Sequence, residues 1–83
     1  MAYRSREEIF ASILSTAGSG ATVTRSKIMF GSYLTYAQVV EYTKMLIQRG
    51  LLEYDAINRT FKTTPSGFMF IQLHHEISQM IKI

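Results

Sequence analysis

The sequence predicts a small, mostly helical α+β domain in which three helices precede a β-hairpin and a long helix follows it. Three observations lead to this fold class. Helices with capping residues recur before Gly50, the apolar period changes from helical to alternating directly after it, and a long apolar helical segment follows Pro65. With 83 residues and no cysteine, the chain forms one small domain at most, and no disulfide stabilises it.

The first predicted helix begins with a capping box at Ser5. The Ser5 hydroxyl can accept from the amide of Glu8, and the Glu8 carboxylate can return to the Ser5 amide. An apolar row follows at helical spacing, formed by Ile9, Phe10, Ile13, Leu14 and Ala17. Gly18 and Gly20 end the helix, so its predicted range is Ser5–Ala17. The next residues, 21–23, predict a short extended segment.

Two further helices are predicted in close succession. Thr24 is a suitable N-cap for a short helix that ends near Gly31 and Ser32, and Thr35 is one for a longer helix that stops at Gly50. On the longer helix we expect a buried face formed by Tyr36, Val39, Val40, Thr43, Leu46 and Ile47. Its outer face would carry Gln38, Glu41, Tyr42, Met45 and Arg49. Two helices joined by about three residues with a glycine are typical of a helix-turn-helix.

After Gly50 the pattern predicts a hairpin. Residues 51–55 and 60–63 alternate as strands, and Asn58 in the loop between them tolerates a positive φ. A hairpin alone is marginally stable, so it must pack on the helices. Three helices followed by a packed hairpin give the outline of a winged helix-turn-helix, with the hairpin as the wing.

The last predicted helix has a cap at Thr64 and a proline at its first position, and it runs to Ile83. Its apolar residues exceed what one small core can cover, and several are spaced as a coiled-coil seam. We therefore expect a homodimer whose interface contains Phe70, Leu73, Ile77, Met80 and Ile81. The predicted division is a winged helix-turn-helix DNA-binding domain at 1–64 and a C-terminal dimerisation helix at 65–83.

Charge and composition exclude several classes of function. A net charge of +3 and a pI near 9.5 favour a polyanionic partner. No apolar run is long enough for a membrane span and residues 1–10 are too polar for a signal peptide, so we expect a cytoplasmic protein, in the host cytoplasm if the protein is viral. His74 and His75 point about 100° apart on a helix and cannot share a metal ion. We expect no metal, cofactor, small-molecule substrate or enzymatic activity.

Four stretches carry a resemblance to a known family: SREEIFASIL, GATVTRSKIMF, YLTYAQVVEYTKMLIQRGLLEYD and FKTTPSGFMFI. In their order and spacing, from Arg6 to Gly67, the chain resembles small archaeal winged-helix DNA-binding proteins. The resemblance implies homodimers joined by a C-terminal antiparallel coiled coil, with double-stranded DNA bound by the winged helix. Members of that family are chromatin-associated proteins, transcriptional regulators and related proteins of archaeal viruses.

The residues expected to contact DNA cluster on three segments. They are Arg25 and Lys27 for phosphates, Ser32, Thr35, Gln38 and Tyr42 for the major groove and its edge, and Asn58, Arg59 and Lys62 on the wing. Gln38 could pair with adenine through both amide atoms, and Tyr42 could reach a phosphate or a thymine methyl. The alternative is a protein–protein interaction module on a winged-helix scaffold, with these residues merely solvated.

Overall fold

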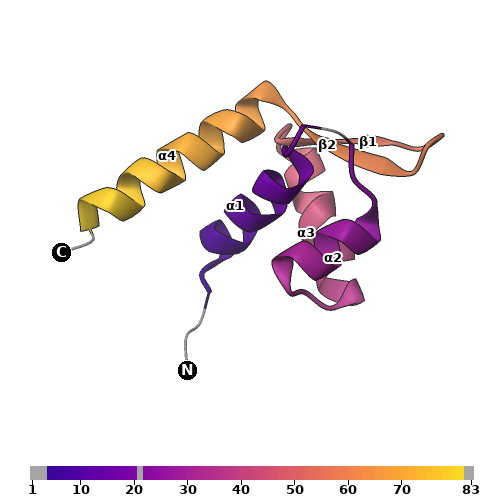
Figure 1. The fold of residues 1–83 in the computed structure, drawn as a ribbon, viewed down its shortest axis with the longest axis horizontal. Coiled ribbons are helices and arrows are strands. Elements are labelled where there is room, and N and C mark those ends of the chain that lie inside the picture. Colours follow the sequence, from indigo (N-terminus) through magenta and orange to yellow (C-terminus); the bar gives the residue numbers. More distant parts are fainter. Residues whose placement is uncertain (1–3, 21, 82–83) are drawn as a thin grey trace.

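A computed structural model describes residues 4–20 and 22–81. Its order of elements agrees with the predicted one (Figure 1): α1 (Arg6–Ala17), α2 (Arg25–Ser32), α3 (Tyr36–Gln48), β1 (Leu52–Asp55), β2 (Thr60–Thr63) and α4 (Pro65–Ile81). Ala21, the predicted start of the short extended segment, and Ile83, the predicted end of the last helix, lie outside the described residues. None of the described helices is long and apolar enough to cross a membrane.

The core is built around α1, which lies between α4 and the α2–α3 pair (Figure 1). The predicted capping box is present, with the Glu8 amide donating to the Ser5 hydroxyl at 3.1 Å and the Ser5 amide to the Glu8 carboxylate at 3.0 Å. The predicted apolar row of α1 is buried throughout. It meets core residues from every other element before α4, namely Val23, Ile28, Leu34, Val39, Leu46, Leu52 and Phe61.

Both turns around α3 depend on left-handed backbone. Tyr33, between α2 and α3, has φ 54° although it is not glycine, and the amide of Leu34 closes the turn on the Met29 carbonyl at 3.0 Å. Gly50, as predicted, has φ 73°. The amides of Gly50 and Leu51 donate to the carbonyls of Ile47 and Leu46, which is the hydrogen-bond pattern of a Schellman C-cap.

The wing is an antiparallel hairpin that extends from the helical body on the side opposite to α4 (Figure 1). Phe61 on β2 is buried and anchors it, and Val23 adds a single antiparallel bridge to Phe61. The positive φ in the loop belongs to Arg59, at 56°, rather than to Asn58 as expected. The side-chain amide of Asn58 instead donates a hydrogen bond to the Asp55 carboxylate, at 2.7 Å, and so closes the loop.

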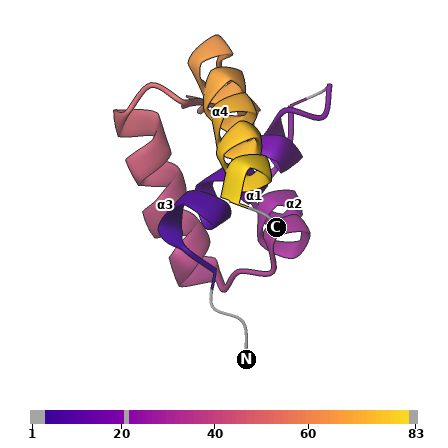
Figure 2. The ribbon, with the colours of Figure 1, turned by 90° about the vertical axis from the view of Figure 1, so that its left-hand side faces the viewer.

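The first half of α4 is part of the core, and its second half extends past it (Figures 1 and 2). Phe70 and Ile71 are partly buried against the core cluster. At Gly67, a Cβ would overlap the carbonyl oxygen of Leu51 and lie 2.6 Å from Cγ2 of Thr63. This close approach explains the glycine, which the sequence alone marks only as a weak point in the helix.

Candidate nucleic-acid interface

The outward face of α3 differs from the predicted one. Val39, Thr43 and Leu46 are buried as expected, but Tyr36, Val40 and Ile47 are exposed, by 62%, 39% and 38%. Tyr42 and Met45, expected on the outer face, are instead partly buried against the core. The cause is the aromatic packing between helices: the Tyr42 ring meets Phe10 of α1 edge-on, with 6.0 Å between centroids.

Gln38, Glu41 and Arg49 of the predicted outer face are exposed as expected. The exposed surface of α3 also includes Tyr36, Ala37, Val40, Lys44, Ile47 and Gln48. Lys44 gives this face a cation. Tyr42 is turned toward α1, so the interface proposed below does not include it.

A hollow of about 450 Å³ lies elsewhere, between α1 and α4, but the one that adjoins α3 is smaller, about 230 Å³. This α3–wing hollow is lined by side chains of α2, α3 and both strands, chiefly Arg25, Val40, Lys44, Ile47, Tyr54 and Phe61. The Arg25 guanidinium lies over the rings of Phe61 and Tyr54, with its carbon 5.4 Å and 5.9 Å from their centroids. Its Nε is buried without a hydrogen-bond partner in the described part of the chain.

The predicted residues at the start of α3 have structural tasks of their own. Thr35 is the N-cap, and Gln38 completes a capping box by accepting from the Thr35 amide at 2.9 Å through Oε1. A bidentate contact of Gln38 with adenine would need this oxygen. Ser32 is fully buried and hydrogen-bonded to Ser12 at 3.2 Å, which leaves it no surface from which to reach DNA.

On the wing, the predicted residues are exposed and closely spaced. The loop is held by Asp55, whose carboxylate accepts from the amides of Ile57 and Asn58 and from the Asn58 side chain. These bonds, foremost that of the Asn58 side chain, lower the pKa of the Asp55 carboxyl. Arg59 lies beside this ordered loop, and Lys62 faces Glu53 across the strand pair.

Sequence reasoning missed several exposed residues near the helix-turn-helix. Phe30, Tyr33 and Tyr36 are exposed by 72%, 88% and 62%, and Ile57 at the wing tip by 92%. For Tyr36 and Val40 the sequence pattern was ambiguous. Val39, Thr43 and Leu46 can be buried together with Tyr36, Val40 and Ile47 on one side of them, or with Tyr42 and Met45 on the other. For Tyr33, no local signal predicts a left-handed tyrosine.

The expected seam of α4 is divided by the structure. Phe70 packs on Phe10 of α1, with 6.2 Å between centroids, while Leu73, Ile77, Met80 and Ile81 are all more than half exposed. Together with Met69, which is 63% exposed, they form an apolar surface that we call the α4 stripe: Met69, Leu73, Ile77, Met80 and Ile81.

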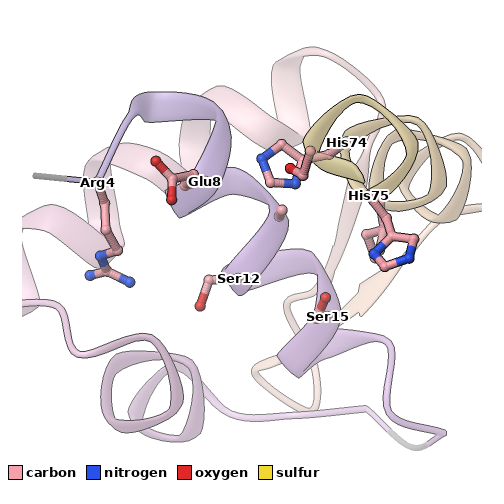
Figure 3. A pocket seen from close by; sticks show the side chains of 9 residues that line it. Arg4, Glu8, Ser12, Ser15, His74 and His75 are labelled. Carbon is pink, nitrogen blue, oxygen red and sulfur yellow. The ribbon is translucent and has the colours of Figure 1, made fainter. Parts of the chain in front are cut away.

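The hollow of about 450 Å³ between α1 and α4 is lined by Arg4, Glu8 and both histidines (Figure 3). The two imidazoles leave α4 in different directions, and the His74 ring stacks on Phe70 at 6.4 Å. Hydrogen bonds from Ser5 lower the pKa of Glu8, with smaller contributions from His74 and Arg4. Across residues 4–20 and 22–81, no three His, Asp or Glu side chains converge in a way that would hold a metal ion.

Comparison with known protein families identifies one family. A family model described as winged helix-turn-helix matches residues 3–82, which is nearly the whole chain and includes α4. The comparison with curated proteins gives no match.

Proposed function

Because the chain belongs to the winged helix-turn-helix family, we propose that it is a double-stranded-DNA-binding protein whose α3 enters the major groove. The observation that carries this proposal is the α3–wing hollow. There Arg25, whose buried Nε has no hydrogen-bond partner among the residues that the structure describes, lies beside the outward face of α3 and at the base of the wing. A cation in that position fits a phosphate next to a groove-bound helix.

The proposed contacts fall into three groups. Arg25 and Lys27, in the first turn of α2, contact phosphates, and Lys44 joins them from α3. Thr35 and Gln38 lie at the groove edge, where Gln38 keeps its Nε2 for a single donor contact while Oε1 caps the helix. Asn58, Arg59 and Lys62 bring the wing to the adjacent groove or backbone.

A salt series of gel-shift titrations tests this proposal. The logarithm of affinity should fall linearly with the logarithm of salt, by about 0.9 for each phosphate contact. Lys27→Ala should reduce that slope by about 0.9, whereas the matched control Arg6→Ala, on the exposed start of α1, should leave it unchanged. No binding at low salt, or a flat salt response, would overturn the proposal.

We also propose that the protein is a homodimer joined through the α4 stripe. Five apolar side chains on one exposed helix surface form a patch of the kind that marks protein interfaces. A second copy of the same helix supplies a matching surface under two-fold symmetry. On this basis the protein would be a transcriptional regulator or chromatin-associated protein of the archaeal type that the sequence resembles.

The dimer is tested by Met80→Asp, which changes a side chain that is 82% exposed and so spares the core. Sedimentation should show monomers. Gln79→Asp adds the same charge at the neighbouring, exposed position about 100° around the helix and should leave the dimer intact. Dimers that persist in Met80→Asp would show that the stripe is not the interface.

The same stripe favours a second candidate function, a protein-interaction module in which α4 binds a different protein. DNA binding separates the two. If gel shifts show no DNA affinity at low salt and the stripe variant remains as monomeric as the parent chain, the interaction module becomes the better account.

A further inference from the structure

The surface of α3 that adjoins the wing carries exposed apolar side chains, with Lys44 and Gln48 beside them. Val40 and Ile47 are each more than one-third exposed and both line the α3–wing hollow, and Tyr36 continues their row toward the start of the helix. Gln38, the amide in the first turn, has its Oε1 occupied by the cap. The part of α3 next to the wing thus presents the methyl groups of Val40 and Ile47 together with the polar ends of Lys44 and Gln48.

In the major groove, thymine differs from the other bases because it carries a methyl group beside its O4 acceptor. Guanine, cytosine and adenine present hydrogen-bond donors and acceptors there, and thymine alone adds a C5-methyl group. We propose that α3 selects thymine by this methyl group, with Val40 as the main contact and Ile47 as its neighbour. The inference rests on the proposed DNA binding and names the base feature that the same site would recognise.

The charges around the row favour DNA over an apolar protein segment as its occupant. Arg25 and Lys44 both line the hollow with Val40, so two cations flank the apolar contact. Arg25 lies over two aromatic rings there, and within residues 4–20 and 22–81 its Nε has no hydrogen-bond partner. A thymine in a duplex brings a methyl group and a nearby phosphate together, and that combination matches this surface.

Deoxyuridine tests the proposal, because it pairs as thymidine does and lacks only the C5-methyl group. Two pools of random-sequence duplexes are prepared, one with thymidine and one with deoxyuridine, and the affinity of the full chain for each is measured by competition. Sites selected from the thymidine pool are then resynthesised with single deoxyuridines. We expect about a fourfold loss of affinity for each contacted methyl group that is removed.

Variants assign the effect to α3. Val40→Ala should bring the two pools to equal affinity, and Val40→Thr, which keeps the β-branched shape, should reduce the difference. Ile57→Thr, at the exposed wing tip, should leave the ratio of affinities unchanged. Circular dichroism establishes that each variant is folded.

The outcomes are distinct. Equal affinity of the parent chain for both pools would overturn methyl recognition and leave DNA binding intact. A thymidine preference that persists in both Val40 variants would overturn the assignment to α3. No binding to either pool at low salt would overturn the proposed function and the inference together.

Discussion

Arg59 joins a strained backbone to a cation at the tip of the wing. Its φ of 56° lies in the left-handed region, where a residue with a Cβ loses about 1–2 kcal/mol relative to the right-handed one. Glycine has no such penalty, although it gives back part of the gain through the entropy of the unfolded chain. We therefore predict that Arg59→Gly raises the free energy of unfolding by roughly 0.5–1 kcal/mol, measured by urea denaturation.

The same substitution should weaken DNA binding, because it removes a proposed phosphate or minor-groove contact. Arg59→Lys is the matched control: it keeps the charge and the strain, so both stability and salt slope should stay near those of the parent chain. If Arg59→Gly were destabilising, the left-handed geometry of the wing tip would be wrong. If Arg59→Gly stabilised the protein and left its affinity for DNA unchanged, Arg59 would not be a DNA contact.

Asp55 makes the order of the wing dependent on pH. Its pKa is lowered in the folded protein, chiefly by the hydrogen bond from the Asn58 side chain, so the ionised form is the one that the fold stabilises. This contribution is fully present above the ordinary value of 3.8 and is lost as the pH falls below it through the lowered pKa. Asn58→Ala removes the first cause, so we predict that the pKa of Asp55 rises toward its ordinary value.

The pKa of Asp55 can be followed by NMR through its carboxyl carbon during an acid titration. Asn58→Asp is unsuitable as a control because it adds a charge, whereas Lys62→Ala, on the strand rather than in the loop, should leave the midpoint nearly unchanged. An Asp55 midpoint that is the same in Asn58→Ala and in the parent chain would contradict the hydrogen-bonded loop.

At the scale of elements, Gly67 decides how closely α4 approaches Leu51, the residue directly before β1. An alanine there would gain about 1 kcal/mol of helix propensity, but its Cβ would overlap the Leu51 carbonyl oxygen, which is backbone and cannot rotate away. Overpacking of this kind costs about 1–3 kcal/mol. We therefore predict that Gly67→Ala lowers the free energy of unfolding by up to about 2 kcal/mol, measured by thermal or urea unfolding.

Ser66→Ala is the control, since it introduces the same residue at the preceding position, which is exposed rather than packed against backbone, and should alter stability by less than about 0.5 kcal/mol. If Gly67→Ala stabilised the protein, helix propensity would outweigh packing, and α4 would sit farther from Leu51 than the structure places it.

The elements also show what the sequence can predict. Ser5, Thr24, Thr35 and Gly50 were predicted correctly as caps and stops because each acts on amides or carbonyls within a few residues. The rotation of α3 was not predictable in this way. The sequence allows either Tyr36, Val40 and Ile47 or Tyr42 and Met45 to be buried beside Thr43. Tyr42 is the buried one because its ring packs on Phe10, which lies more than thirty residues earlier in the chain.

The candidate site was predictable to the same limited degree. The segments that form it were identified, since the order of helices and hairpin determines them. Most of the individual residues remain proposals, but two were misjudged. Ser32 is buried and hydrogen-bonded to Ser12 of α1, a tertiary contact that the local sequence does not reveal. Gln38 is engaged by the capping box with Thr35, a local pattern that the sequence does contain.

At the scale of the whole molecule, the two halves of α4 have different roles: the first half packs in the core of the monomer, and the second half contributes to the proposed dimer interface. Phe70 contacts Phe10 and the core, whereas Leu73, three residues later, is 51% exposed. We predict that Phe70→Ala lowers the stability of the monomer by about 2 kcal/mol, less than the 3–5 kcal/mol of a fully buried phenylalanine. Leu73→Ala should leave the monomer within about 0.5 kcal/mol of the parent chain.

Protein concentration separates the two effects, because the midpoint temperature of a dimer that unfolds to monomers rises with concentration. Thermal unfolding is therefore measured at two concentrations roughly a hundredfold apart. Phe70→Ala should lower the midpoint at both, since it acts on the fold itself. Leu73→Ala should mainly reduce the difference between them, since it acts on association. Equal losses from both substitutions at every concentration would mean that the two halves of α4 serve the same packing, and that the α4 stripe has no role of its own.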